Sequence, residues 1–136
     1  MNDFEWADFY NVADCLATKD DEASIRSALS RYYYAVFGMA RWYLTEILHE
    51  YKFKSVDSSN HGDMALRLEK SSDDNEAFVG EALSKLRNVR NNADYDLKDF
   101  DYEAYLNGNL AKVQKYSKDS LNTINSLIQD PNYKIP

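Results

Sequence analysis

The longest regular pattern of hydrophobic positions in the chain lies between residues 21 and 51. Apolar side chains recur there at spacings of three, four and seven residues: Ile25, Leu29, Tyr32, Val36, Tyr43 and Ile47. This spacing places them on one face of an α-helix and leaves polar residues on the opposite face. The pattern therefore predicts a long amphipathic helix over 21–51, which we expect to be the central element of the fold.

Four further segments have helical periodicity, over residues 3–17, 61–70, 75–95 and 102–129. Their predicted core positions are Phe4, Trp6, Phe9, Tyr10, Ala13 and Leu16 in the first; Val79, Ala82, Leu83, Leu86, Val89 and Ala93 in 75–95; and Leu106, Leu110, Val113, Leu121, Ile124 and Ile128 in the last. Gly108 is a weak point of the last helix, because glycine disfavours helix interiors. About five helices joined by short loops predict an all-α, up-and-down helical bundle.

Polar segments separate these helices and offer capping residues. Thr18, Asp20 and Asp21 precede the long helix, and the loop SSDDNE (71–76) precedes the helix over 75–95. Such side chains accept hydrogen bonds from the first free amides of a helix. No repeat or linker interrupts the pattern, so residues 1–130 are predicted to form a single helical domain. Residues 131–136 are predicted to be a flexible C-terminal tail.

Composition and charge narrow the possible functions. The chain has 136 residues with a net charge of −7, which argues against broad, non-specific binding to nucleic acid but not against a small basic cleft. Its single cysteine, Cys15, cannot form an internal disulfide and is expected to be a small core residue. The N-terminus does not have the pattern of a signal peptide. No apolar run approaches the roughly 20 residues of a membrane span. We therefore expect a soluble, cytoplasmic protein that does not bind membranes.

One stretch, LRNVRNNADYDL (86–97), is unusually polar for a packed helix. On a helix, Arg87, Asn91 and Asp94 share one face, and Arg90 lies at its border. Two neighbouring guanidinium groups match phosphate bidentately, asparagines add donors and acceptors, and Tyr95 adds a phenol. The stretch therefore indicates a site for a phosphodiester or a nucleotide.

A purely structural interpretation of the same stretch remains open. Arg90 and Asp94 are an i, i+4 pair of opposite charge, which stabilises a helix by a few tenths of a kcal/mol. In this interpretation Tyr95 covers an edge of the core.

The order of three segments resembles a known family. These are ALSRYYYAVFGMARWYL (28–44), HG (61–62) and LRNVRNNADYDL (86–97). Together they resemble the HEPN domain family, in particular its small stand-alone prokaryotic branch with an SRxYYAxF helix and an RxxADY helix. The residues that match are Ser30, Arg31, Tyr33, Tyr34, Ala35 and Phe37 in the first motif and Arg90, Ala93, Asp94 and Tyr95 in the second. The resemblance covers roughly residues 1 to 130.

This resemblance implies a helical bundle that forms a homodimer. It also implies a ribonuclease toxin or effector of a toxin–antitoxin or phage-defence system, with a small nucleotidyltransferase as antitoxin partner. In the active ribonucleases of the family, a histidine follows an arginine after a short spacer, and two such motifs meet across the dimer in a cleft for RNA. This chain departs from that pattern, because its only histidines, His49 and His61, both precede Arg87.

The missing histidine leaves several candidates for proton transfer. Histidine is suited to this role because it titrates near neutral pH, whereas tyrosine and aspartate are weaker choices. In a ribonuclease, Arg90 would hold the scissile phosphate, Arg87 would assist, Asn91 would orient the substrate, and Tyr95 or Asp94 would handle the proton. His61 either enters the cleft in place of the missing histidine or caps the short helix that it begins. His49 is expected at the surface or the edge of the core.

Three consecutive tyrosines in the long helix point in different directions. Tyr32 falls on the core stripe, so at least one of Tyr33 and Tyr34 faces a neighbouring helix or a dimer partner. Arg31 lies three residues before Tyr34 and is expected to stack on it or to pair with Asp94.

The sequence leaves three functions open. The first is a metal-independent RNA endonuclease, and the second is a non-catalytic module that binds a nucleotide or RNA and pairs with a nucleotidyltransferase. In such a pair Tyr95 is the candidate for modification by adenylate. The third is a dimerisation domain without a ligand. We expect no cofactor and no metal, because two distant histidines and one cysteine form no recognisable ligand set.

Overall fold

The computed structural model describes residues 4–55 and 58–129, and every regular element within these ranges is helical. The helices in chain order are α1 (Ala7–Ala17), α2 (Glu22–Trp42), α3 (Ser58–Glu69), α4 (Asp74–Tyr95), α5 (Tyr102–Ala104) and α6 (Leu110–Gln129). Two π-helical segments, η1 (Tyr43–Ile47) and η3 (Tyr105–Asn109), and one 3₁₀ segment, η2 (Tyr51–Lys54), complete them. The predicted all-α fold is confirmed.

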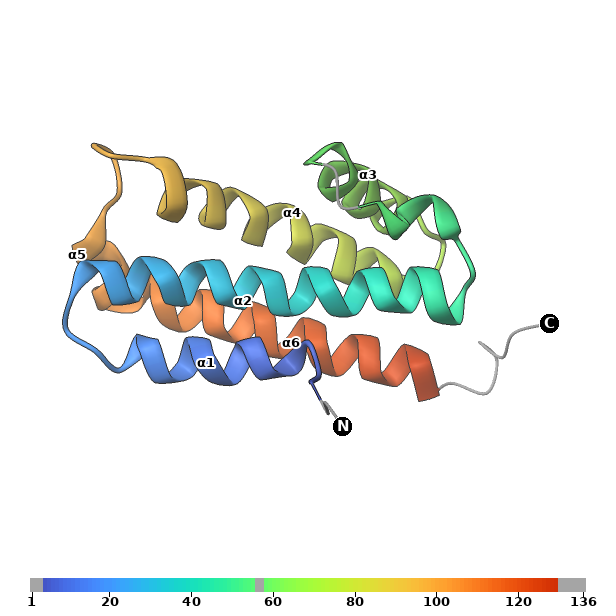
Figure 1. Ribbon diagram of the computed structural model, residues 1–136, viewed down its shortest axis with the longest axis horizontal. Coiled ribbons are helices and arrows are strands. Elements are labelled where there is room, and N and C mark those ends of the chain that lie inside the picture. Colours follow the sequence, from blue (N-terminus) through green and yellow to red (C-terminus); the bar gives the residue numbers. More distant parts are fainter. Residues whose placement is uncertain (1–3, 56–57, 130–136) are drawn as a thin grey trace.

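The long helices lie side by side and alternate in direction along the chain (Figure 1). Helix α2 contacts α1, α4 and α6, so it is the central element, as its hydrophobic stripe predicts. Helix α3 lies apart from this arrangement and packs against α4 at one end of the bundle (Figure 1).

A glycine allows α3 to approach α4 closely. A Cβ atom at Gly80 of α4 would lie 2.3 Å from the backbone nitrogen of Glu69 and 2.8 Å from the carbonyl oxygen of Ala65. Any side chain at this position would push the two helices apart. The contact at Gly80 therefore sets where the preceding part of α3 lies along α4.

Three aspartates cap helices at the polar segments between them. The side chain of Asp21 accepts a hydrogen bond from Ser24 N at 2.7 Å, and that of Asp73 accepts one from Glu76 N at 2.9 Å. Asp101 caps α5 in the same way, at 3.0 Å from Ala104 N. Each bond satisfies an amide that has no partner within its helix. Asp21 and the SSDDNE loop therefore act as caps, as predicted.

The core follows the predicted stripes of α2 and α4 closely, whereas on the predicted stripe of the first helix only Ala13 is buried and Phe4 is 44% exposed. The fully buried apolar side chains on the stripes of α2 and α4 include Ile25, Leu29, Tyr32, Val36, Val79, Ala82, Leu83, Leu86 and Ala93. On α6, Val113, Leu121 and Ile124 are buried as predicted, whereas Leu110 and Ile128 are only partly buried and Leu127, which was not predicted, is buried. Val89 is only partly buried. Burial of these faces is the main favourable contribution to folding.

One buried polar network joins three of the helices. The hydroxyl of Tyr32 donates to Asp14 Oδ1 at 2.6 Å, and the amide of Gln114 donates to the same oxygen at 2.8 Å. Burial, together with the bond to Asp14, raises the pKa of Tyr32. The network therefore keeps its proton on the tyrosine and ties α1, α2 and α6 together.

The predicted long helix ends earlier than Tyr51. After Trp42 the winding widens into η1, and the amide of Leu48 bonds the carbonyl of Tyr43 at 3.1 Å. His49 then adopts a left-handed backbone with φ 58°, which stops the helix. His49 itself is exposed, as expected for a surface residue.

Several smaller expectations were wrong. The first helix begins at Ala7 rather than residue 3, and the third begins at Ser58 rather than His61. Cys15 is exposed and is not a core residue. Leu106 is half exposed because the backbone kinks immediately after it, where Gly108 has φ 134°. The expected tail over 131–136 lies outside the described residues.

Within the described residues, none of the helices combines the length and the apolar character that crossing a bilayer requires.

Candidate functional site

The two motif-bearing segments, one on α2 and one on α4, lie against each other. Ser30 of α2 donates a hydrogen bond to Asp94 Oδ2 of α4 at 3.1 Å. Arg31, the next residue, places its guanidinium 5.0 Å from the ring centre of Tyr34 and 4.9 Å from that of Phe9. Of the two expectations for Arg31, stacking on Tyr34 is the one observed.

Arg90 lies at the centre of this contact. Arg90 is only 8% exposed. Its guanidinium carbon lies 5.4–5.6 Å from the ring centres of Tyr33, Tyr34 and Tyr95. Cation–π contacts of this kind stabilise a guanidinium that has lost water. The charge is therefore held by aromatic faces rather than by a close carboxylate.

The polar contacts of Arg90 are few for a buried arginine. Its Nη1 donates to the Tyr95 hydroxyl at 3.3 Å and lies 3.9 Å from Asp94 Oδ2, the outer limit of an ion pair. Its Nε is buried and has no hydrogen-bond partner among the described residues. Buried donors are rarely left unpaired, so this guanidinium has capacity for a further acceptor.

Arg87 repeats this feature one helical turn earlier. Its Nε is also buried without a hydrogen-bond partner in the described part of the chain. Its Nη1 reaches the backbone of α3 at Gly62, where an added Cβ would lie 3.1 Å away. The glycine in the HG pair thus leaves room for the arginine beside His61.

His61 is inserted between α2 and α4. Its ring stacks on Phe37 with centroids 3.9 Å apart and an angle of 7° between planes, and Tyr34 meets it edge-on at 6.2 Å. The Tyr33 hydroxyl is hydrogen-bonded to Nδ1 of the imidazole. Among the described residues, the other ring nitrogen, Nε2, has no hydrogen-bond partner.

The surroundings keep His61 neutral. Burial, followed by the charges of Arg90 and Arg87, lowers its pKa to about 4. Burial also raises the pKa of Tyr33, although the same two arginines act in the opposite direction. Near neutral pH the site therefore contains two cations, a neutral imidazole and a protonated phenol.

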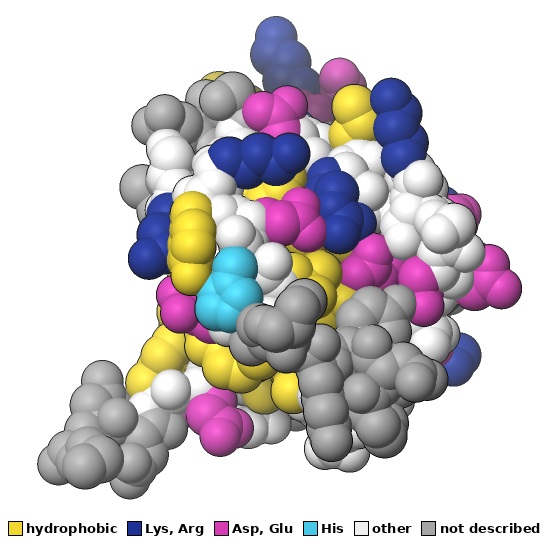
Figure 2. All heavy atoms as spheres, turned by 90° about the vertical axis from the view of Figure 1, so that its right-hand side faces the viewer, with side chains coloured by type: hydrophobic (Ala, Val, Ile, Leu, Met, Phe, Trp, Pro, Cys, Tyr) yellow, Lys and Arg dark blue, Asp and Glu magenta, His cyan; other side chains and the backbone are white. Residues whose placement is uncertain are grey.

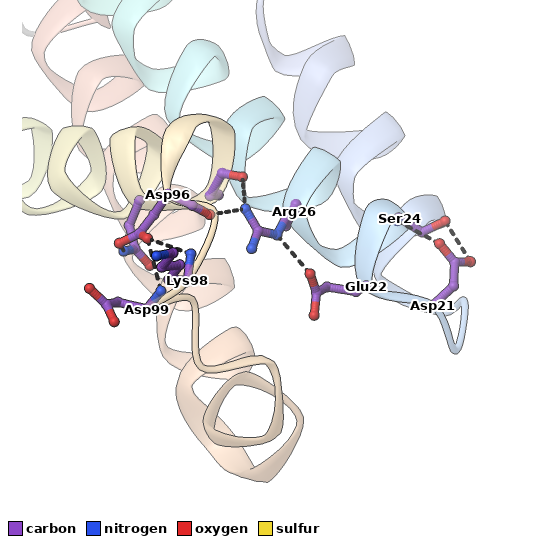
Figure 3. A network of polar contacts seen from close by, with 9 residues as sticks. Asp21, Glu22, Ser24, Arg26, Asp96, Lys98 and Asp99 are labelled. Carbon is purple, nitrogen blue, oxygen red and sulfur yellow. Dashed lines mark hydrogen bonds and ion pairs between the residues drawn. The ribbon is translucent and has the colours of Figure 1, made fainter.

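The C-terminal end of α4, beside Tyr95, is fixed by an arginine of α2 (Figure 3). Arg26 donates to the carbonyl oxygens of Ala93 at 3.1 Å and Asp96 at 2.6 Å. The Asp96 side chain then accepts the amides of Lys98 and Asp99, which turns the chain away from the helix. This arrangement caps the last carbonyls of α4 and holds the end that carries Asp94 and Tyr95.

Most of the residues predicted for the site do come together. Arg87, Arg90, Asp94, Tyr95 and His61 surround one region between α2, α3 and α4, and Arg31 lies at its edge. Asn91 is exposed, and its side chain makes no hydrogen bond with the described residues. His49 lies elsewhere, bonded to the Tyr51 hydroxyl at 2.5 Å.

Four residues of α2 belong to the site although no role had been predicted from the residues themselves. Ser30, Tyr33, Tyr34 and Phe37 follow the spacing i, i+3, i+4 and i+7, which marks a second helix face beside the core stripe. The rings of this face surround Arg90 and His61. The spacing of the motif could have identified this helix face, but nothing in the sequence identified the side chains that the face contacts.

Figure 2 views the end of the bundle at the right of Figure 1, opposite to the C-terminal end of α4, and basic and acidic side chains are intermixed on this face. The described residues also contain no group of three or more His, Cys, Asp or Glu side chains placed to hold a metal ion.

Comparison of the chain with family models, with curated proteins and with solved structures finds no match.

Proposed function

We propose that this chain is an HEPN-like protein that binds the phosphodiester backbone of RNA at Arg87 and Arg90 and cleaves it without a metal ion. Its place would be that of a toxin or effector in a toxin–antitoxin or phage-defence system of the cytoplasm. The proposal rests on one observation above the others. Arg90 is a nine-tenths buried guanidinium with an unpaired Nε, and Arg87 one turn away has the same unpaired atom.

A phosphate fits this arrangement chemically. Two guanidinium groups on one face offer planar pairs of donors, which match the oxygens of a phosphodiester. Asp94 is already engaged by Ser30, so we assign it a positioning role on Arg90 rather than proton transfer. The Tyr95 hydroxyl, 3.3 Å from Arg90 Nη1, lies where it can bond the bound phosphate or the leaving oxygen.

Aromatic rings beside the arginines favour single-stranded RNA as substrate. Tyr95 is 71% exposed and Tyr34 is partly exposed, so both present ring surface next to the proposed phosphate position. Unpaired bases stack on such rings, whereas bases inside a duplex are not available. With a net charge of −7, affinity would come from this local site and not from the whole surface.

A homodimer is part of the proposal. Tyr95 and Leu97 are 71% and 92% exposed at the end of α4, an unusual exposure for large apolar side chains. A second copy would cover them and bring two arginine pairs together in one cleft.

A second candidate function is a non-catalytic module that binds a nucleotide or RNA and pairs with a nucleotidyltransferase antitoxin. The exposed side chain of Tyr95 favours it, because a partner enzyme could transfer adenylate to its hydroxyl oxygen. In that case the arginines would bind without cleavage.

The experiment is a metal-free cleavage and binding assay on purified protein with several single-stranded RNAs. We expect the parent to bind and cleave, Arg90→Ala to lose both, and Arg87→Ala to weaken both. Lys118→Ala is the control, because it removes one positive charge from an exposed position of α6. Binding without cleavage would favour the second function. Absence of binding, or binding unaffected by the arginine variants, would contradict the proposal.

A further inference from the structure

The imidazole of His61 is the one group near the arginines with the chemistry of a neutral base. It belongs to α3, the helix before α4 in the chain, whereas both arginines belong to α4. Phe37 stacks on its ring and Tyr34 meets it edge-on, so its orientation is set before any ligand arrives. A side chain that only filled space would not need a polar ring held among aromatic rings.

We propose that His61 is the catalytic base of this site and that Tyr33 is its positioning residue. This inference rests on the proposed function, because it assumes that RNA is bound at Arg87 and Arg90. The geometry supports it in three ways, through the Tyr33 contact, the proximity of the arginines and the state of the imidazole.

Tyr33 occupies one nitrogen of His61 and leaves the other open. Its hydroxyl is hydrogen-bonded to Nδ1, and no other hydrogen bond of this imidazole occurs among the described residues. The proposal takes the tautomer in which Nδ1 carries the proton and donates to the tyrosine oxygen, because Nε2 then has a free lone pair. Tyr33 is buried and keeps its own proton, so it remains a neutral partner throughout.

The two arginines lie near His61. Arg90 lies over the ring of Tyr33 at 5.5 Å, and Arg87 Nη1 reaches Gly62, the residue after His61. The charged groups that act on the imidazole are these two arginines of α4, and the tyrosines facing it are Tyr33 and Tyr34 of α2. A phosphate held by both guanidinium groups would bring its adjoining ribose close to His61.

The step balances without a cofactor. Nε2 of His61 takes the proton of the ribose 2′-hydroxyl, and the 2′-oxygen forms a bond to phosphorus. The bond from phosphorus to the 5′-oxygen breaks, and that oxygen leaves with a proton from water. The products are a 2′,3′-cyclic phosphate and a 5′-hydroxyl, and the imidazolium returns its proton to water.

Bound phosphate also increases the basicity of His61. Without ligand, the arginine charges keep the imidazole neutral and a weak base. A phosphodiester neutralises part of that charge, which favours protonation of the imidazole at the moment the proton arrives. The base is therefore strengthened by its own substrate.

The test compares His61→Gln with His49→Gln in the full chain. His49 is the matched control, because it is the other histidine and it is also bonded to a tyrosine hydroxyl, in a segment outside α2, α3 and α4. We expect kcat/KM for RNA cleavage to fall at least about 100-fold in His61→Gln and to stay within about twofold of the parent in His49→Gln. Binding of RNA with 2′-O-methyl ribose, which cannot be cleaved by this route, should be retained in both.

Two further measurements separate a catalytic role from a structural one. Added imidazole should restore cleavage to His61→Ala in proportion to its concentration, which repair of folding would not do. Tyr33→Phe keeps the ring and removes the hydroxyl, so it should shift the pH dependence of kcat/KM while leaving RNA binding intact.

The outcomes distinguish the inference from the proposed function. Cleavage by His61→Gln at the rate of the parent would overturn the role of His61 and leave the ribonuclease function standing. A parent that binds RNA at the arginines without cleaving it would overturn the inference and leave binding standing. A parent that does not bind RNA would overturn both.

Discussion

Arg67 is partly buried and Arg90 is buried, and the hydrogen-bond donors of these two arginines are paired to very different extents. Arg67 of α3 has a carboxylate partner for each of its nitrogens. Its Nε and Nη2 donate to Glu50 at 2.9 and 2.7 Å, and its Nη1 donates to Glu76 at 2.9 Å. Tyr43 donates to the remaining oxygen of Glu76 at 2.5 Å, so the network is closed.

Arg90 has no such closure. Its nearest carboxylate oxygen is 3.9 Å away, its Nε is unpaired among the described residues, and its charge faces three tyrosine rings. An arginine with a carboxylate on every nitrogen stabilises the fold, whereas one with a nitrogen left unpaired is prepared for a ligand. The comparison teaches that burial of an arginine does not by itself distinguish structure from function. The pairing of its donors does.

The largest effect should separate the two arginines by stability. Arg67→Met would leave the carboxylate of Glu76, only 5% exposed, without its main partner, and we expect a loss of about 3 kcal/mol in unfolding free energy. Arg90→Met removes a guanidinium that is only partly satisfied and keeps apolar volume against the tyrosines. We expect a change below about 1 kcal/mol. Urea denaturation that gives equal losses for both variants would remove the distinction.

An acid titration should separate the two regions by pH. The pKa of His61 is about 4 in the folded chain and 6.5 when unperturbed, so the unfolded chain binds more protons between these values. The contribution of His61 is therefore present above pH 6.5 and is lost as the pH falls to about 4. Allowing for solvent screening, the loss is on the order of 1–2 kcal/mol.

The Arg67 network should respond at lower pH. Burial alone would raise the pKa of Glu76, but hydrogen bonds from Tyr43 and Arg67 lower it on balance. The stability it contributes is thus lost only below its unperturbed value of 4.5. In His61→Gln, unfolding measured from pH 7 to pH 5 should show a smaller decrease than in the parent. The same decrease in both proteins would contradict the assignment.

The sequence was most informative where a pattern is local. The stripe of α2 and the caps Asp21 and Asp73 could be predicted because helical periodicity and capping depend on neighbours within one turn or two. The end of α2 could not be predicted in this way. His49 turns left-handed next to Glu50, and Glu50 is held by Arg67, seventeen residues away along the chain.

The same division runs through the candidate site. The α4 residues Arg87, Arg90 and Asp94 could be grouped because they recur on one helix face. The position of His61 beside them depends on where α3 packs along α4, and the close contact at Gly80 fixes this position. The Arg67 network was not predicted either, because its members are far apart in the sequence and do not share a helix face.

The smallest expected effect concerns the salt dependence of RNA binding. It tests directly whether Arg90, and not Arg67, meets phosphate. Each phosphate neutralised on single-stranded RNA contributes a slope of about −0.7 to the logarithm of the association constant against the logarithm of salt concentration. Arg87→Met and Arg90→Met should each reduce the slope by about 0.7, which is roughly a threefold change in affinity between 50 and 200 mM salt. Arg67→Met should leave the slope unchanged, because two carboxylates already neutralise its charge. Fluorescence anisotropy with a 2′-O-methyl oligonucleotide measures all three variants. If Arg67→Met changed the slope as much as Arg90→Met did, unpaired donors would not identify the arginines that meet phosphate.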